Sequence, residues 1–269
     1  MSRPYFNQNV VIITGASSGI GRALAYQLAD EGAYLSLAAR NSERLDQVTG
    51  ECQKRGGKAI AIQTDVSEQS QCNRLIQRTV EEYGCIDTLI NNAGQTMWAC
   101  FDELETLIPL EIIMQVNYFG SVYCTFAALP YLKQSGGRIV AVSSLTGKTG
   151  VPTRSGYAAS KHAMVGFFDS LRIELAASNV TVTIIYPDFV ATETRQRAFG
   201  SDGKPLGVSP VQESKVMSAD ECARIIIGAA GSRKRECVMG LRGKIGQYLR
   251  VFAPSITDWI AERAIDRGR

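Results

Sequence analysis

Three polar side chains in the middle of the chain have types and spacings suited to proton transfer. Tyr157 precedes Lys161 by four residues, which places the phenol and the ammonium on one face of a helix. A nearby ammonium stabilises a phenolate, so a tyrosine beside it can exchange a proton with an alcohol near neutral pH. Ser144 lies 13 residues before Tyr157 and can hydrogen-bond a reacting oxygen. Together these residues predict acid–base chemistry on a hydroxyl or carbonyl group.

A glycine-rich turn near the N-terminus predicts a phosphate-binding site. The sequence TGASSGIG covers residues 14–21, between an expected strand and an expected helix. Gly15, Gly19 and Gly21 would let the backbone approach a phosphate, because a Cβ atom there would block the turn or the approach. The free N–H groups of the following helix would face the pyrophosphate of a dinucleotide. The glycine triplet taken alone also fits an ordinary structural turn.

The ends of the expected strands indicate which dinucleotide would bind. An acidic residue at the end of the second strand would bind the ribose 2′-hydroxyl of NAD, and Ala39 supplies none. Arg40 can pair with a 2′-phosphate, so we expect NADP(H) to be favoured over NAD(H). A solvated arginine at a helix start is the alternative interpretation. Asp65-Val66 and residues 91–94 follow the third and fourth strands, at the edge where open α/β sheets bind ligands.

A regular alternation of strands and helices must position these residues. Short runs rich in Val, Ile, Leu and Ala lack strict alternation, as in strands that are covered on both faces. We expect strands at 9–14, 34–39, 58–63, 87–91, 137–143, 180–186 and 236–239. Helical periodicity falls at 20–31, 42–55, 68–83, 110–133, 156–177 and 219–230. This order predicts an α/β fold with a doubly wound parallel sheet of about seven strands and helices on both faces.

Composition restricts the class of protein. The chain has 269 residues, 45% of them hydrophobic, so it can bury a core without a disulfide or metal. Its net charge of +3 is far below that of nucleic-acid-binding domains, and we expect no nucleic-acid partner. Seven scattered cysteines and the single histidine, His162, supply no metal-ligand set, so we expect no metal site.

The N-terminus and the apolar runs indicate where the protein resides. Residues 9–14 have the pattern of a buried strand and not of a signal peptide. By this interpretation no uncharged apolar run approaches the ~20 residues of a membrane span. We therefore expect a cytoplasmic protein.

From about residue 8 to residue 240, the chain resembles the short-chain dehydrogenase/reductase family in its compact single-domain branch. The motifs that carry the resemblance are TGASSGIG, Asp65, NNAG, Asn117, Ser144, YAASK and YPDFVATET. The resemblance implies a Rossmann-type fold and hydride transfer between NADP(H) and a carbonyl or secondary alcohol. It implies a hydroxysteroid-dehydrogenase-like enzyme that carries a C-terminal extension.

The resemblance also assigns roles to single residues. Tyr157 would be the general acid/base, Lys161 would bind the nicotinamide ribose, and Ser144 would polarise the reacting oxygen. Asn117 would hold a water that links Lys161 to bulk solvent, and the neighbouring Ser143 would be structural. The implied cofactor-binding residues are Gly15, Ser17, Ser18, Gly19, Ile20, Gly21, Arg40, Asp65, Val66, Asn91, Ala93, Gly94, Tyr157, Lys161, Pro187, Val190 and Thr192.

Two positions depart from the family's pattern, and one neighbour of the site needs a separate interpretation. Asp188 stands where a glycine normally follows Pro187, so it must tolerate glycine-like backbone angles or bend the loop differently. Ser18 stands in the glycine turn, where many NADP-using members have a second basic residue. His162 follows Lys161, but one helical step turns it about 100° away, and we expect a structural role.

Apolar residues gather around the expected site and indicate an apolar substrate, although the same side chains could pack in the core or in a loop. They are Met97, Trp98, Phe101, Leu145, Val151, Phe189, Phe199, Leu206 and Val208. The long connection 188–215, which holds the last four, is typical of a functional flap or a disordered insert.

Two alternative functions remain open. A 3-oxoacyl-thioester reductase of lipid synthesis would usually end soon after the seventh strand, whereas this chain continues past Gly240. A non-catalytic NADP-sensing module would be expected to lose Tyr157 or Lys161, and both are present.

Two helices have the pattern of an oligomer interface. Helices 110–133 and 156–177 are apolar on more than one face, so the sheet could cover one side and a partner subunit the other. Together with the resemblance, this pattern indicates a homodimer or homotetramer. Core packing alone is the alternative interpretation.

The charge distribution divides the chain into two parts. Residues 231–269 hold nine basic and four acidic residues, and the rest of the chain has a net charge of −2. We divide the chain into an NADP-binding catalytic domain at 1–240, which includes the loop 188–215, and a basic amphipathic extension at 241–269. Pro254 would end a first helix of the extension, and a capping box at Ser255 would begin a second. The extension would pack on the domain or on a partner subunit, or contact an anionic membrane surface through 241–265.

Overall fold

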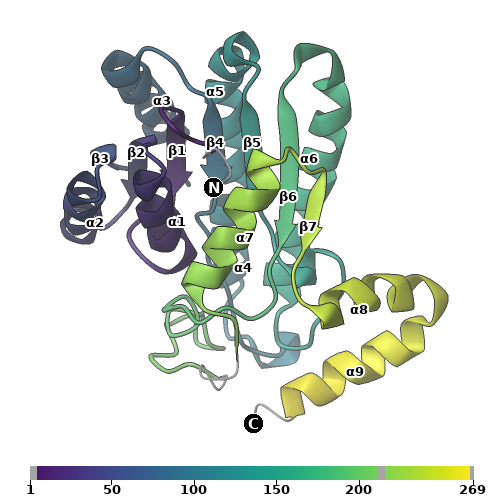
Figure 1. Cartoon of the computed structure of the whole chain (residues 1–269). Coiled ribbons are helices and arrows are strands. Elements are labelled where there is room, and N and C mark those ends of the chain that lie inside the picture. The colour runs from purple at the N-terminus through teal and green to yellow at the C-terminus, as the bar shows by residue number, and fades with distance from the viewer. Residues whose placement is uncertain (1–4, 211–215, 267–269) are drawn as a thin grey trace.

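Seven strands form one parallel sheet in the computed structural model, which describes residues 5–210 and 216–266 (Figure 1). The order across the sheet is β3-β2-β1-β4-β5-β6-β7. The strands are β1 (Val10–Thr14), β2 (Tyr34–Ala39), β3 (Lys58–Gln63), β4 (Thr88–Asn91), β5 (Arg138–Val142), β6 (Thr181–Tyr186) and β7 (Glu236–Val238). The seven strands and the doubly wound sheet expected from the sequence are confirmed.

Helices cover both faces of the sheet because successive side chains of the buried strands point to opposite faces. In β1, Val11 and Ile13 pack into one hydrophobic cluster, and Ile12 packs into the other. The first cluster is covered by α1 (Gly19–Asp30), α2 (Ser42–Lys54) and α7 (Ala219–Gly231). The second is covered by α3 (Gln69–Tyr83), α5 (Gly120–Ser135) and α6 (Ser155–Glu174). The result is a three-layer α/β fold.

The topology places a crevice at the centre of the sheet. β1 pairs with β2 on one side and with β4 on the other, so the strand order reverses between β1 and β4. Open α/β sheets bind ligands at such a reversal, outside the carboxyl ends of the strands. The glycine turn leaves β1 at this edge.

The helix expected at 110–133 is composed of three segments. α4 (Ile108–Met114) continues through a π-helical turn, η2 (Gln115–Phe119), into α5. By length and composition alone, the continuous helix Ile108–Ser135 could cross a membrane, which is weak evidence because a buried core helix passes the same test. No charged residue lies between Glu111 and Lys133, so the expectation that no apolar run approaches spanning length is wrong.

Two helices follow the sheet at its carboxyl edge. α8 (Leu241–Phe252) and α9 (Pro254–Asp266) form the yellow pair beside β7 in Figure 1. A Cβ atom on Gly243 would lie 2.6 Å from the Leu145 side chain, so α8 packs closely against the loop that follows β5. α9 begins at Pro254, because proline is well suited to the first helical position, and the capping box expected at Ser255 is wrong.

Candidate active site

A cavity of about 1170 Å³ opens at the carboxyl edge of the sheet. The residues that line it come from the glycine turn, from the ends of β2 to β6, and from α6, α8 and α9. Among the predicted site residues, the lining contains Gly15, Ser17, Ser18, Ile20, Arg40, Asp65, Val66, Ala93, Gly94, Ser144, Tyr157, Lys161, Pro187, Val190 and Thr192. Gly19, Gly21, Asn91 and Asn117 are not among the lining residues, and the last three are buried.

The glycine turn is held closely against the end of β4. Gly15 has a φ of 67°, and a Cβ atom on it would lie 2.9 Å from the Cα of Ala93. A Cβ atom on Gly21 would overlap the carbonyl oxygen of Gly15. The Thr14 hydroxyl accepts hydrogen bonds from the N–H groups of Asn92 and Ala93, both at 3.0 Å. The packing of this turn therefore requires glycine at positions 15 and 21.

Asn92 lines the cavity, although only its neighbours Asn91, Ala93 and Gly94 are predicted to bind the cofactor. Its Nδ2 donates to the carbonyl oxygen of Thr14 at 2.9 Å, which ties the end of β4 to the end of β1. Its neighbour Asn91 points into the core, where Nδ2 donates to Thr125 Oγ1 at 3.0 Å. The NNAG motif could have indicated Asn92, but the strand pattern does not show which of two adjacent amides faces the cavity.

Lys161 and Tyr157 meet on one face of α6. Lys161 Nζ donates to the carbonyl oxygen of Val142 at 2.9 Å and lies 5.8 Å from the centroid of the Tyr157 ring. Burial disfavours the charged ammonium and lowers the pKa of Lys161 to about 8. The i,i+4 spacing therefore gives the juxtaposition expected from the sequence.

Ser144 stands at the start of a short helical turn. It precedes η3 (Leu145–Gly147), a 3₁₀ turn, and its Oγ accepts from the N–H of Thr146 at 3.3 Å. The hydroxyl hydrogen remains available for a ligand in the cavity that Ser144 lines. The neighbouring Ser143 donates to the carbonyl oxygen of Lys161 at 3.4 Å and so links β5 to α6.

Asn117 lies beside Lys161 but is fully buried. Its Oδ1 accepts from the N–H of Gln95 at 2.7 Å, and its Nδ2 donates to the Gln95 carbonyl and to Ser160 Oγ, both at 2.9 Å. A Cβ atom on Gly94 would lie 3.4 Å from Asn117 Oδ1 and 3.8 Å from Lys161 Nζ. The π-helical turn η2, a feature that often marks functional sites, carries Asn117 to this position.

Comparisons with known proteins agree with this geometry. The model of the short chain dehydrogenase family matches residues 9–202. The chain belongs to this family. It is 36% identical over 257 residues to 11-beta-hydroxysteroid dehydrogenase 1A from Arabidopsis thaliana, a match that covers 93% of the chain and 73% of the relative. It is 34% identical to a dehydrogenase/reductase SDR family protein 7-like protein from Dictyostelium discoideum, covering 96% of the chain and 82% of that protein.

Solved structures of the family have the same fold. An alcohol dehydrogenase from Thermococcus sibiricus, in complex with 5-hydroxy-NADP, matches with a TM-score of 0.75 and 27% identity, over 86% of this chain and 95% of that one. A short chain dehydrogenase/reductase from Burkholderia phymatum, in complex with NAD, matches with a TM-score of 0.83 and 24% identity, over 94% and 96%. This short-chain dehydrogenase is therefore an oxidoreductase of a family that uses NAD(P), and its cavity and glycine turn fit such a cofactor.

The departure at position 188 changes the loop of this short-chain dehydrogenase. Non-glycine residues with positive φ in the described chain are Gln8, Thr153, Asn179 and Arg233, so Asp188 does not adopt glycine-like angles. Its Oδ1 instead accepts from the N–H of Phe189 at 2.9 Å. Of the two expectations for this position, tolerance of glycine-like backbone angles is therefore excluded, and the Asp188 carboxylate binds the next backbone N–H. His162 does not line the cavity, and its Nδ1 lies 2.9 Å from the Ala158 carbonyl oxygen.

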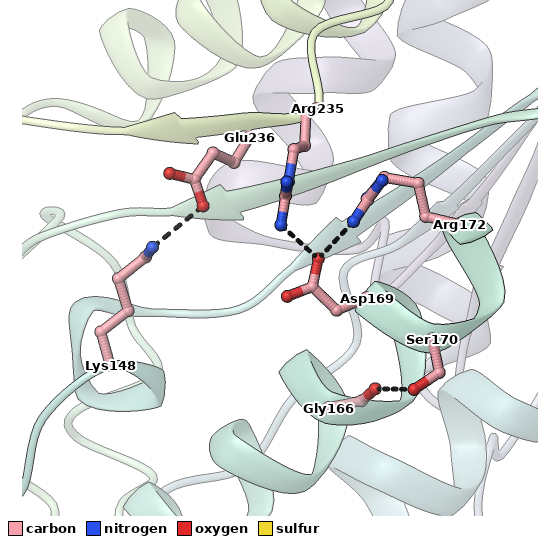
Figure 2. Close-up of polar contacts among 7 residues, drawn as sticks. All are labelled: Lys148, Gly166, Asp169, Ser170, Arg172, Arg235 and Glu236. Carbon is pink, nitrogen blue, oxygen red and sulfur yellow. Dashed lines mark hydrogen bonds and ion pairs between the residues drawn. The ribbon is translucent and has the colours of Figure 1, made fainter.

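Figure 2 shows how the edge of the sheet holds two segments near the site. Lys148, which follows η3, pairs with Glu236 of β7 at 2.9 Å. Asp169 of α6 accepts from Arg172 at 3.2 Å and from Arg235 at 3.3 Å. Such exposed pairs stabilise a fold by about 0–1 kcal/mol each, so their main effect is to orient η3 and α6.

Arg154 is a residue that the sequence reasoning missed. It lines the cavity with only 6% of its surface exposed, and its Cζ lies 4.8 Å from the Tyr157 ring centroid and 5.1 Å from that of Trp98. Nη2 donates to Thr96 Oγ1 at 2.7 Å, and Nε has no hydrogen-bond partner in the described structure. Burial lowers the pKa of this guanidinium. Its position depends on Thr153, whose φ of 65° is rare for a β-branched residue.

The apolar wall of the cavity differs from the one expected. Trp98, Leu145, Val151 and Phe189 line the cavity as expected. Phe101 and Val208 instead face solvent, and Met97, Phe199 and Leu206 lie outside the lining. Trp259 and Ile260 of α9, which are 50% and 48% exposed, also line the cavity. Sequence reasoning missed these two because only the tertiary structure brings the C-terminal helix to the site.

Proposed function

We propose that this chain transfers a hydride between NADP(H) and a carbonyl or secondary alcohol of an apolar substrate. Tyr157, Lys161, Ser144 and Asn117 are the residues that we assign to the reaction. The observation that carries the proposal is that Tyr157 and the buried Lys161 line the same cavity as the glycine turn. The names of the hydroxysteroid dehydrogenase relatives support the same class of chemistry.

Each of the assigned residues has a distinct task. A nicotinamide cofactor supplies or accepts the hydride at the substrate carbon. During reduction, Tyr157 gives its phenolic proton to the substrate oxygen, and during oxidation the phenolate takes that proton back. Ser144 donates a hydrogen bond to the same oxygen and stabilises its charge in the transition state.

The remaining assigned residues support Tyr157. The Lys161 ammonium, 5.8 Å from the Tyr157 ring centroid, stabilises negative charge on the phenolate and binds the nicotinamide ribose. Asn117 holds the Gln95 backbone beside Lys161, and we assign to it the water that would link Lys161 to bulk solvent. Arg154 keeps the Tyr157 ring in place by packing on its face.

The basic residue after β2 supports NADP(H) over NAD(H). Ala39 offers no carboxylate to a ribose hydroxyl, and Arg40 lines the cavity. Arg40 has no ion-pair partner among the described residues, so its charge is available to a 2′-phosphate. One solved structure holds NAD and the other an NADP derivative. The preference for NADP(H) is therefore argued from this chain's own residues.

The substrate that fits this wall is apolar. Trp98, Leu145, Val151 and Phe189 face the cavity, and Trp259 and Ile260 of α9 line one side of it. Many polar residues line the rest of the cavity, and this apolar wall binds a steroid-like or aromatic carbonyl better than a sugar. On this proposal, residues 1–240 form the catalytic domain, and the extension 241–269 contributes part of the substrate site.

Exposed apolar side chains support a homodimer or homotetramer. Phe126 and Ile173, on α5 and α6, are 71% and 66% exposed, and Phe119 of η2 is 38% exposed.

We place the protein in the cytoplasm. The extension, whose Phe252 is 83% exposed, could also contact an anionic membrane surface. Analytical ultracentrifugation and vesicle sedimentation with phosphatidylserine test these two contacts.

The experiment that tests the function follows NADPH oxidation with a panel of ketones and aldehydes of increasing apolar size. We expect turnover that rises with apolar size and is at least tenfold faster with NADPH than with NADH. NADPH binding without turnover of any panel member would instead favour a cofactor-sensing module.

A further inference from the structure

The loop that leads away from β6 reaches back to the glycine turn. Arg197 lies in this loop, 179 residues after Ser18, and its Nη2 donates to Ser18 Oγ at 2.8 Å. Ser18 is the residue before α1, and its side chain makes no capping hydrogen bond to that helix. Arg197 and Ser18 both line the cavity. The guanidinium therefore lies at the phosphate-binding turn.

A second contact ties the same loop to the cofactor side of the cavity. Glu193 pairs with Arg44, in the first turn of α2, at 2.7 Å. This contact and the hydrogen bond of Arg197 hold the loop across the helix starts α1 and α2. The loop is therefore held by residues at the starts of α1 and α2, on the side of the cavity where we expect the nucleotide.

The charges at this position are not balanced. Partial burial lowers the pKa of Arg197, Glu193 opposes the shift, and the positive charges of Arg44 and Arg40 add to it. Among the described residues of this cluster, four guanidinium groups, of Arg22, Arg40, Arg44 and Arg197, surround the single carboxylate of Glu193, and that carboxylate is paired with Arg44. Like charges held together at the edge of a cavity favour binding of an anion.

We propose that Arg197 binds the 2′-phosphate of NADP(H) together with Arg40. The inference rests on the NADP(H) preference proposed above. It names Arg197 as the second positively charged side chain that would produce this preference. Ser18 occupies the place where a basic side chain would otherwise reach the phosphate from the turn. Arg197 reaches the same place from the loop, and Ser18 anchors it there through the 2.8 Å hydrogen bond.

Calorimetric titration with 2′,5′-ADP and with 5′-AMP isolates the phosphate, because the two ligands differ only in that group. A charge-assisted hydrogen bond contributes about 1.5–3 kcal/mol, which is roughly 10- to 100-fold in affinity. We expect Arg197→Ala to weaken 2′,5′-ADP binding by roughly tenfold or more and 5′-AMP binding less than twofold. Arg197→Lys should keep most of the affinity, and Arg197→Gln, which keeps a donor for Ser18 without the charge, should not.

Two further variants separate the possible failures. Arg224→Ala removes an exposed arginine of α7 outside the cavity lining and should leave both titrations unchanged. If Arg40→Ala weakens 2′,5′-ADP binding and Arg197→Ala does not, the role of Arg197 is overturned and the NADP(H) preference stands. If the unaltered protein binds 2′,5′-ADP no tighter than 5′-AMP, both proposals are overturned. An equal loss for both ligands in Arg197→Ala also contradicts the role, since it points to a general change of the turn.

Discussion

The ammonium of Lys161 donates to the carbonyl oxygen of Val142 at 2.9 Å, while only 3% of the lysine surface is exposed. Among the described residues, the other contact of Nζ is Met164 Sδ at 3.8 Å, and no carboxylate pairs with the ammonium. A charged group so enclosed costs stability, which is why the pKa of Lys161 falls to about 8. The folded protein therefore keeps an ammonium that is unfavourable for its stability at the position where the proposed reaction needs a positive charge.

This cost predicts an unusual pH dependence of stability. Between pH 8 and its ordinary pKa of 10.5, Lys161 binds more protons in the unfolded chain than in the folded one. The free energy of unfolding therefore rises with pH across this window, and the penalty is fully present below pH 8. The fall of the pKa from 10.5 to about 8 corresponds to a net penalty of about 3 kcal/mol, in which the hydrogen bond to Val142 is already contained.

We expect Lys161→Met to raise the free energy of unfolding by about 2 kcal/mol at pH 7, while it abolishes turnover. Urea unfolding at pH 7, 9 and 10.5 measures the difference between the variant and the unaltered protein. Other titrating groups cancel in that difference, so the gain should shrink steadily towards pH 10.5. A difference that stays constant over this range contradicts the account of a buried charge.

Arg154 offers a test of how the Tyr157 ring is supported. Its guanidinium packs on the ring face and stabilises negative charge on the phenolate, an effect of about 1–2 kcal/mol where solvent is excluded. We expect Arg154→Met to lower kcat by roughly tenfold, to move the pH–rate profile to higher pH, and to leave the Kd for NADPH unchanged. Partial rescue by Arg154→Lys would distinguish the charge from packing, and an unshifted profile would reduce Arg154 to a structural role.

Alanine should have different effects at two helical glycines: loss of NADPH binding at Gly21, and a gain in stability at Gly228. Gly21→Ala forces a methyl group onto the Gly15 carbonyl and should abolish NADPH binding. Gly228 lies inside α7, where a methyl group would meet no atom within 4 Å beyond its own stretch of helix, and Gly228→Ala should raise stability by about 0.5–1 kcal/mol. Fluorescence titration with NADPH and thermal unfolding measure both effects. NADPH binding that survives Gly21→Ala would mean that the turn does not hold the cofactor.

Removing the C-terminal helices separates the cofactor half from the substrate half. A chain ending at Gly240 loses Trp259 and Ile260 from the cavity wall and keeps the glycine turn. We expect its Kd for NADPH to change less than threefold, and its KM for large apolar ketones to rise at least tenfold. Small ketones, which do not reach α9, serve as the control. Equal changes for small and large ketones would place the helices outside the substrate site.

The fold could be predicted from the sequence because its signals are local. The five inner strands are short apolar runs between helical segments, and burial on both faces produces that pattern, whereas the edge strands β3 and β7 are only partly buried. The spacing of Tyr157 and Lys161 also translates directly into geometry, because a helix repeats every 3.6 residues.

The missed features are those that depend on tertiary structure. Arg154 enters the site through the positive φ of Thr153, and no residue pattern marks that conformation. Phe101 follows the fourth strand closely, which predicts a place at the cavity, yet it is 62% exposed. Arg197 contacts a residue 179 positions away, a separation over which sequence spacing carries no geometric information.

Deuterium transfer from C4-deuterated NADPH tests the central claim most directly, because it follows the hydride and not the loss of cofactor signal. Unaltered protein and Tyr157→Phe are compared with a ketone that the panel identifies, after both are shown to bind NADPH with the same Kd. We expect the unaltered protein to place deuterium on the carbinol carbon, and the variant to do so at least roughly a thousandfold more slowly. Transfer by Tyr157→Phe at the unaltered rate would contradict the role of Tyr157 and the mechanism built on it.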